Sequence, residues 1–134
     1  MQYALLVYAP HDDTEPGDTE PGDTEPGNPE RGGTDRARRP MPGTLAALLD
    51  QPHVTGWTRL HADESATTLR TGDGQLLVTD GPFIDSKEYL AGLIQIEAGN
   101  LDEALAIAGE LLQETSPGTA IEVRPVLGER PRGA

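Results

Sequence analysis

From Tyr3 to Tyr8 every side chain is apolar, and no other feature limits the folds open to this chain as strongly. We predict a strand over residues 2–8. Alternate side chains of a strand point to opposite faces, so its two faces carry Tyr3, Leu5 and Val7 on one side and Ala4, Leu6 and Tyr8 on the other. A strand that is apolar on both faces must be covered on both sides.

The remaining elements follow from hydrophobic periodicity and turn residues. They are a short helix over 45–50 capped by Thr44, strands over 54–60, 66–71, 75–79 and 89–97, a helix from Asn100 to about 114, and a strand over 121–126. Gly72-Asp73-Gly74 predicts a hairpin turn, and Glu103, three residues after Asn100, completes a capping box. This order predicts an α+β, ferredoxin-like sandwich, a mostly antiparallel sheet with two helices on one face.

Two helices cannot cover both faces of such a sheet. The simplest additional layer is a second copy that packs sheet to sheet across a two-fold axis, so we predict a homodimer. In the strand over 89–97 we expect Leu90, Ile94 and Ile96 on one face, with Ala91 and Leu93 on the other. The predicted core is Leu5, Val7, Leu48, Leu90, Ile94, Ile96, Leu105 and Ala108.

An acidic repeat interrupts the pattern. Asp-Thr-Glu-Pro-Gly occurs three times in tandem, at 13–17, 18–22 and 23–27. These repeats offer no aliphatic or aromatic side chain to bury, and each contains a proline without an N–H. We therefore predict one domain over 1–134, interrupted by a disordered acidic repeat loop at about 11–40. The spacing of these carboxylates does not match that of a calcium-binding loop.

Composition excludes several classes of function. The net charge of −13 repels phosphate backbones, which argues against direct nucleic-acid binding. Without cysteine the chain has no thiolate nucleophile and no Cys-ligated zinc, and its three histidines lack the spacing of a metal site. No phosphate-binding glycine loop and no apolar run of about 18 residues is present. We predict a cytoplasmic protein without metal, cofactor or membrane contact.

The segment 79–89 is the candidate site, because it contains the single phenylalanine and the single lysine of the chain around an Asp-Gly-Pro turn. We predict that Asp80, Phe83, Lys87 and Glu88 bind a ligand there. Each also has an ordinary alternative. Asp80 would accept backbone hydrogen bonds within its own turn, Phe83 would fill the core or a dimer interface, and Lys87 would form an exposed ion pair.

His61 is the third catalytic candidate, beside Asp80 and Lys87. Its neighbours Asp63 and Glu64 are acids, and a histidine beside carboxylates suits a proton shuttle. The alternative is a solvated surface histidine.

Six motifs together resemble the YCII-related family in its Asp-Gly-Pro-Phe branch. They are YALLVY at 3–8, ATTLR at 66–70, VTDGPF at 78–83, KE at 87–88, LDEA at 101–104 and EVRPV at 122–126. The resemblance covers about residues 1–10 and 54–127. It implies a dimeric α/β-barrel fold of ferredoxin-like type with a cleft beside the Asp80–Phe83 motif.

The resemblance leaves the function open. Relatives are often linked to sigma-factor genes, and a His–Asp pair has been proposed as a catalytic site in the wider superfamily. The helix predicted over 45–50 contains no histidine, so that pair cannot be carried over.

Three hypotheses remain. The first is a small-molecule-binding or accessory protein. The second is a cofactor-independent lyase or isomerase with Asp80 or His61 as base and Lys87 as electrostatic support. The third is an interaction module, linked to transcription regulation, that docks a basic partner through the acidic repeat. Neither ligand nor reaction follows from the sequence.

Overall fold

The computed structural model describes residues 1–11, 41–84 and 86–130. Apart from its first residue, the predicted repeat loop at about 11–40 lies outside these ranges. The elements are β1 (Gln2–Pro10), α2 (Gly43–Leu49), β2 (Val54–Arg59), a 3-10 turn η1 (Asp63–Ser65), β3 (Thr67–Gly72), β4 (Gln75–Asp80), β5 (Glu88–Glu97), α3 (Leu101–Gln113) and β6 (Ala120–Pro125). No helix in the described part of the chain is long and apolar enough to cross a membrane.

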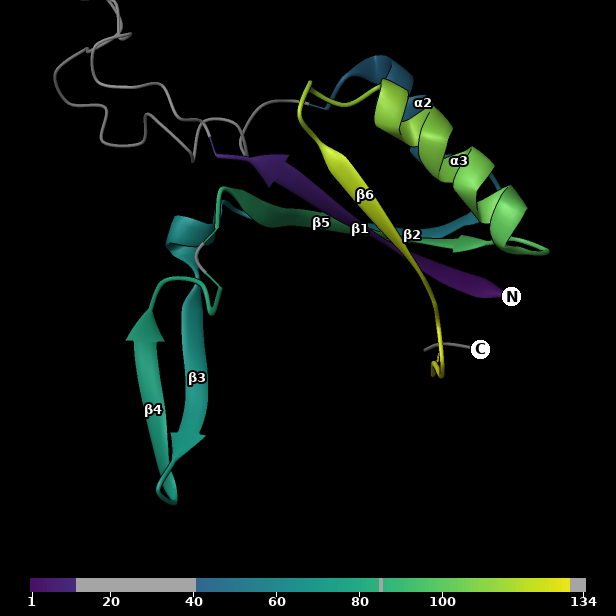
Figure 1. Cartoon of the computed structure of the whole chain (residues 1–134). Helices are drawn as coiled ribbons and strands as arrows, with labels where there is room; N and C mark the ends of the chain where they lie inside the picture. The colour runs from purple at the N-terminus through teal and green to yellow at the C-terminus, as the bar shows by residue number, and fades with distance from the viewer. Residues whose placement is uncertain (12–40, 85, 131–134) are drawn as a thin grey trace, which may run out of the picture.

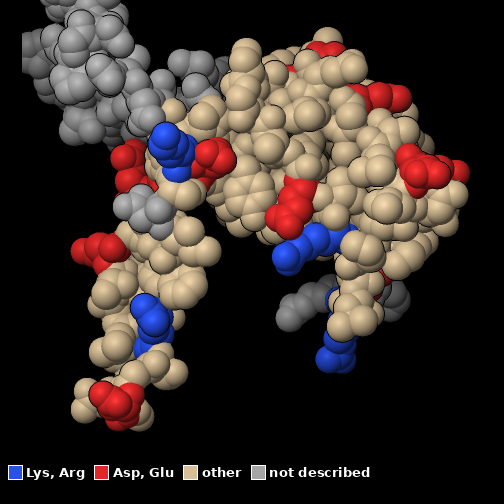
Figure 2. Space-filling view, in the orientation of Figure 1, with Lys and Arg blue, Asp and Glu red and all other residues tan. Residues whose placement is uncertain are grey.

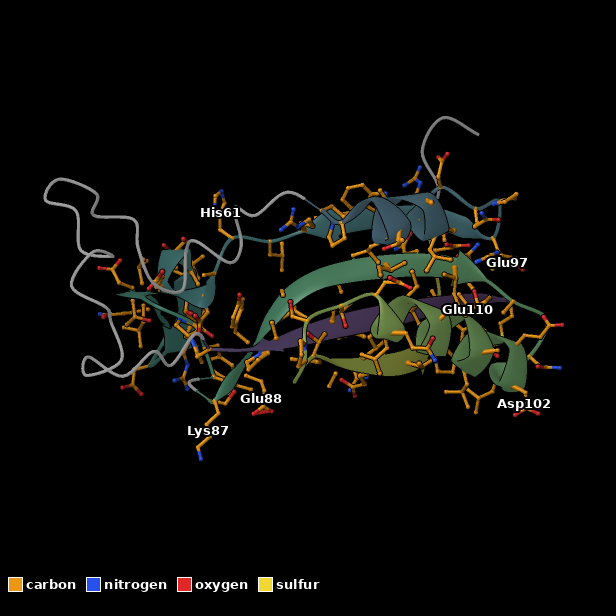
Figure 3. All side chains as sticks on the ribbon, turned by 90° about the horizontal axis from the view of Figure 1, so that it is seen from above. His61, Lys87, Glu88, Glu97, Asp102 and Glu110 are labelled. Atoms are coloured by element: carbon orange, nitrogen blue, oxygen red, sulfur yellow. The ribbon has the colours of Figure 1, made fainter. Side chains whose placement is uncertain are left out.

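Four strands form an antiparallel sheet in the order β2-β5-β1-β6. Both helices lie on one face of it (Figure 1). Viewed from above, α3 lies over β1 and β6 while α2 lies over β2 (Figure 3). This is the α+β, ferredoxin-like arrangement, with two crossovers that each contain a helix, and it confirms the predicted fold class.

The core lies between the sheet and the helices, and β1 contributes to it as predicted. Tyr3 and Leu5 are buried there, whereas Ala4 and Leu6 on the other face remain half-buried. The buried cluster consists of Tyr3, Leu5, Leu49, Ile94, Ile96, Ala98, Ala104, Ala108 and Leu111. We call the sheet face that carries Ala4 and Leu6 the open face, because both helices lie on the opposite side.

Two predicted core residues are wrong. A bulge pairs Val7 with Gly92 but Tyr8 with Leu90, and the extra residue turns Leu90 to the open face. Leu105 is 49% exposed, because α3 packs on the sheet through Ala104, Ala108 and Leu111. This stripe lies about 100° around the helix from Leu105.

The helix starts agree only in part with the capping signals. Asn100 Oδ1 accepts a hydrogen bond from Glu103 N at 2.9 Å, as the capping box predicts. Glu103 Oε2, however, accepts from Gly99 N at 2.6 Å, one residue before the expected donor. The short helix α2 begins at Gly43, and Thr44 does not cap it, because Pro42 occupies the cap position and its carbonyl accepts from Ala46 N at 3.0 Å.

The hairpin formed by β3 and β4 is a separate two-stranded sheet, which we call the arm (residues 67–80). Asp73 and Gly74 join its strands with φ values of 51° and 76°, and positive φ at both positions is the signature of a type I′ turn. The arm projects from the body on the side away from the helices (Figures 1 and 2). The predicted hairpin is therefore present.

Candidate functional site

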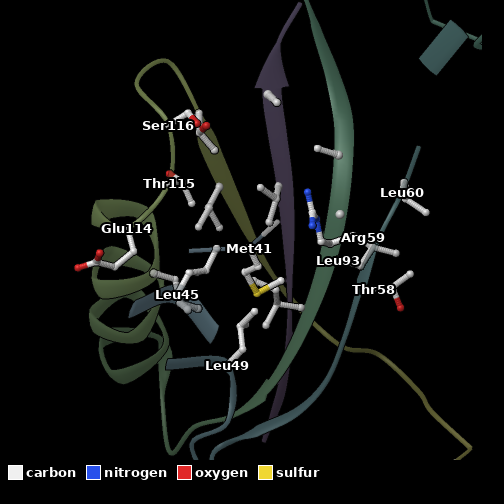
Figure 4. Close-up of a pocket in the computed structure, with 18 of the residues that line it drawn as sticks. Met41, Leu45, Leu49, Thr58, Arg59, Leu60, Leu93, Glu114, Thr115 and Ser116 are labelled. Carbon is white, nitrogen blue, oxygen red and sulfur yellow. The ribbon is translucent and has the colours of Figure 1, made fainter. Parts of the chain in front are cut away.

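A cavity of about 440 Å³ lies between the sheet and the helices, at the end of the sheet where β1 ends and β5 begins (Figure 4). Most of its wall is apolar. The apolar side chains come from both helices and from the sheet, and include Val7, Ala9, Met41, Leu45, Leu49, Ile94, Leu111 and Ile121. A concave, mainly apolar site of this size is typical of small-molecule binding.

A few polar groups face the same cavity. Arg59 at the end of β2 brings a positive charge to one wall, whereas the carboxylate of Glu114, after α3, points away from the cavity (Figure 4). Thr115, Ser116 and Thr119 add hydroxyl groups in the connection to β6. Thr115 Oγ1 donates to the carbonyl of Leu112 at 2.6 Å, which fixes its side chain at the end of α3.

The cavity exists because large side chains are scarce at this end of the sheet. Ala9, Ala91 and Gly92 line it, and at Gly92 even a Cβ would lie only 2.8 Å from the carbonyl oxygen of Thr58. The helix α2 has only 7 residues, so it covers a short part of the sheet. The small residues on the sheet and the short helix α2 together leave room for a ligand.

A histidine and an aspartate meet next to the cavity. His11 Nε2 lies 3.0 Å from Asp63 Oδ2, in an ion-pair contact without the angle of a hydrogen bond. Nε2 is shielded from solvent and has no hydrogen bond among the described residues. The His11 ring also contacts the ring of Tyr89, with centroids 5.2 Å apart, and Tyr89 lines the cavity. Tyr89 therefore connects the His11–Asp63 pair to the cavity wall.

Comparison with known proteins now decides the family. A model of the YCII-related domain matches residues 37–127, which is more than half of the chain. The chain belongs to the YCII-related family. It is also 40% identical over 73 residues to the uncharacterized protein R00369 of Rhizobium meliloti (strain 1021), a match that covers 54% of this chain and 59% of that protein. The match thus spans less than two thirds of that relative.

The predicted membership is confirmed, and the assignment to the Asp-Gly-Pro-Phe branch stays a prediction. The motif of this YCII-related chain lies at the base of the arm. Thr68 Oγ1 donates to the carbonyl of Gly81 at 2.7 Å, and Gly81 N donates to the carbonyl of Ala66 at 2.7 Å. These two hydrogen bonds hold the turn. Neither of them involves the carboxylate of Asp80, which is exposed.

The four predicted ligand-binding residues lie outside the cavity wall. Asp80, Phe83, Lys87 and Glu88 are all exposed, and none is among the described residues that line the cavity. Phe83 is 66% exposed and therefore does not fill the core. Its ring lies 5.2 Å from the guanidinium carbon of Arg70, a cation–π contact. Lys87 and Glu88 point away from the body (Figure 3).

The structure also separates the predicted catalytic residues. His61 is exposed, and its neighbour Asp63 contacts His11 instead. No contact among Asp80, His61 and Lys87 is present in the described part of the chain. Lys87 helps to position His11 through its backbone, because the carbonyl of Lys87 accepts a hydrogen bond from His11 N at 2.9 Å. That bond places His11 beside Tyr89.

Sequence reasoning missed both the cavity and the His11–Asp63 pair. His11 and Asp63 are far apart in the sequence, so no local motif joins them. The short helix together with small residues at the end of the sheet was the signal for the cavity. No cluster of three or more metal-ligating side chains is present among the residues that the structure describes.

Proposed function

We propose that this YCII-related protein binds a small, mainly apolar molecule with one polar or anionic group. The cavity between the sheet and the helices carries the proposal, because it combines a volume of about 440 Å³ with an apolar wall and a few polar groups. It lies apart from the Asp80–Phe83 motif, so we place the ligand there rather than beside the motif.

The cavity wall explains the expected selectivity. Apolar contact contributes about 25 cal/mol per Å² of buried surface. This contact supplies affinity but does not fix the orientation of the ligand. Arg59 in the cavity wall orients the polar end of the ligand toward its guanidinium group if that end is anionic. A wholly apolar ligand would desolvate the polar groups of the wall, such as the hydroxyl of Ser116, without replacing their hydrogen bonds to water, which costs free energy.

Filling the cavity tests this proposal. Leu45 lines it and is half-buried, so Leu45→Trp should occupy much of the space. In a thermal-shift screen with small aromatic carboxylic acids and their amides, ligands should raise the Tm of the wild type. We expect Leu45→Trp to abolish these shifts.

Leu105→Trp is the matched control, because Leu105 is exposed on α3 and lies outside the cavity wall. It should keep the ligand shifts of the wild type. Ligand shifts that survive Leu45→Trp, or a wild type that responds to no ligand, would contradict a binding site in the cavity.

A second candidate function is proton transfer, favoured by the contact between His11 and Asp63. A carboxylate beside one imidazole nitrogen holds the ring in place and favours a proton on that nitrogen. In neutral His11 this leaves Nδ1 as the acceptor, the role of a general base. The geometry thus favours His11, rather than Asp80 or His61, as the base of a cofactor-independent lyase or isomerase.

The tautomer of His11 tests this role without a known substrate. ¹⁵N NMR of the imidazole should show neutral His11 with its proton on Nε2. Asp63→Asn should shift the tautomer ratio, because it removes the negative charge that favours a proton on Nε2. Spectra that are the same in both proteins would show that Asp63 does not set the state of His11, and would remove this candidate.

We also propose that the protein is a cytoplasmic homodimer. The open face supports this, because Leu6 lies opposite Leu93 across β1 and β5, and Leu93 remains 38% exposed in the single chain. A two-fold axis would cover both copies of this face at once. The third hypothesis, an interaction module built on the acidic repeat, rests on residues outside the described ranges.

A further inference from the structure

The single tryptophan of the chain, Trp57, remains 47% exposed in β2. β2 is an edge strand of the sheet, and Trp57 pairs with the core residue Ile94 on β5. Because residues directly opposite each other on neighbouring strands share a face, the indole lies on the face that the helices cover. There it lines an open groove at the end of α2. We call this the Trp57 groove; it is formed by Ala46, Ala47, Leu49, Asp50 and Trp57.

The Trp57 groove is distinct from the cavity between the sheet and the helices. Of the described residues that line the groove, only Leu49 also lines the cavity, and its side chain is buried. Ala46 and Ala47 each present a single methyl group. The lining comes from the end of one helix and from one strand residue. It therefore suits one compact chemical group and is too short for an extended chain.

Asp50 gives the Trp57 groove a negative charge. It is the exposed residue that ends α2, and a carboxylate there adds to the negative end of the helix dipole. The last turn of α2 contains no basic residue. No lysine, arginine or histidine is among the described residues that line the groove. The groove thus combines an aromatic ring with a negative charge that no basic residue of its own lining balances.

This combination favours a weakly hydrated cation as the ligand. The face of an indole ring attracts cations more strongly than any other side-chain ring. A primary ammonium is strongly hydrated and needs hydrogen-bond acceptors for its N–H groups, which the methyl groups of Ala46 and Ala47 do not supply. A trimethylammonium group has no N–H to satisfy, and its methyl groups can pack on both alanines. The net charge of −13 also attracts cations to the protein.

We propose that the Trp57 groove binds a small molecule that carries a trimethylammonium group. The cation lies over the indole of Trp57, and the carboxylate of Asp50 balances its charge. This site is additional to the one proposed for the cavity, and its ligand has the opposite charge preference.

Fluorescence of the intact protein tests the proposal, because Trp57 is the only tryptophan. The probe is choline, added at constant ionic strength so that the screening of charges does not change during the titration. We expect a change in emission that saturates. The neutral carbon isostere of choline, in which a tert-butyl group replaces the trimethylammonium group, has the same shape without the charge and should produce no such change.

Variants assign the binding to the groove. Asp50→Asn keeps the shape of the side chain and removes its charge, and it should weaken choline binding about two- to fivefold, the range of an exposed ion pair. Trp57→Leu, followed by calorimetry because its emission is lost, should weaken binding about tenfold or more. Glu110→Gln is the matched control. It removes one exposed charge from α3 (Figure 3) and should bind choline as the wild type does.

Three results would overturn the proposal. They are a wild type that shows no saturable response to choline, an isostere that binds as tightly as choline, and Asp50→Asn or Trp57→Leu proteins that keep the affinity of the wild type. Arginine ethyl ester serves as a further probe. If it binds more tightly than choline, the groove accepts a guanidinium group, as on the surface of a partner protein, and the assignment to a trimethylammonium compound is wrong.

Discussion

Replacing Leu5 by alanine is expected to lower the free energy of unfolding by about 2–5 kcal/mol. Leu5 is 0% exposed and lies in the central strand, opposite Ile94 on β5 and Val123 on β6. Truncation leaves a void that neither strand can fill without breaking its ladder. Urea denaturation at a fixed protein concentration measures the change.

Leu105→Ala is the matched control, because the same truncation removes a side chain that is 49% exposed. It should cost less than about 1 kcal/mol, as most exposed substitutions do. Equal losses for the two variants would mean that the core does not lie between β1 and the helices.

Gly92→Ala is expected to cost about 1–3 kcal/mol, because a side chain there overpacks a close contact between strands. The added Cβ would lie 2.8 Å from the carbonyl oxygen of Thr58, which belongs to the backbone of β2 and cannot rotate away. β2 must shift, and Arg59 shifts with it. We therefore also expect weaker ligand shifts in the thermal screen.

Gly109→Ala is the control for this change. A Cβ at Gly109 meets nothing within 4 Å, and Gly109 lies inside α3. Alanine should raise the stability by about 0.5–1 kcal/mol, because glycine is the poorer helix former. A Gly92→Ala protein as stable as the wild type would show that β2 and β5 do not approach as closely as described.

Periodicity predicted the elements well because β1 and α3 have strong local patterns. The alternation in β1 identified Tyr3 and Leu5 as one face, and the capping box at Asn100 identified the start of α3. The error at Leu90 has a physical cause, because a bulge depends on the pairing of two strands and leaves no trace in the alternation of one. Leu105 was misplaced because α3 has a leucine stripe, Leu101, Leu105 and Leu112, beside the stripe of Ala104, Ala108 and Leu111, and only packing against the sheet decides which one is buried.

The candidate site was predicted less well, because it depends on contacts between distant segments. The segment around Asp80 and Phe83 was conspicuous for its rare residues, yet in the structure it forms the base of an exposed arm. The cavity results from what is missing, namely large side chains near Ala9 and Gly92 and a longer first helix. Arg59 has no motif around it, so only the fold reveals its position at the cavity.

Amide chemical shifts of the ¹⁵N-labelled protein, recorded during titration with small aromatic carboxylic acids, test the proposed binding site most directly. We predict that the largest changes cluster around the cavity, at Leu45, Arg59, Tyr89 and Thr115, and that they saturate with ligand. Changes centred on the Asp80–Phe83 turn or on the arm, with the cavity amides unmoved, would contradict binding between the helices and the sheet.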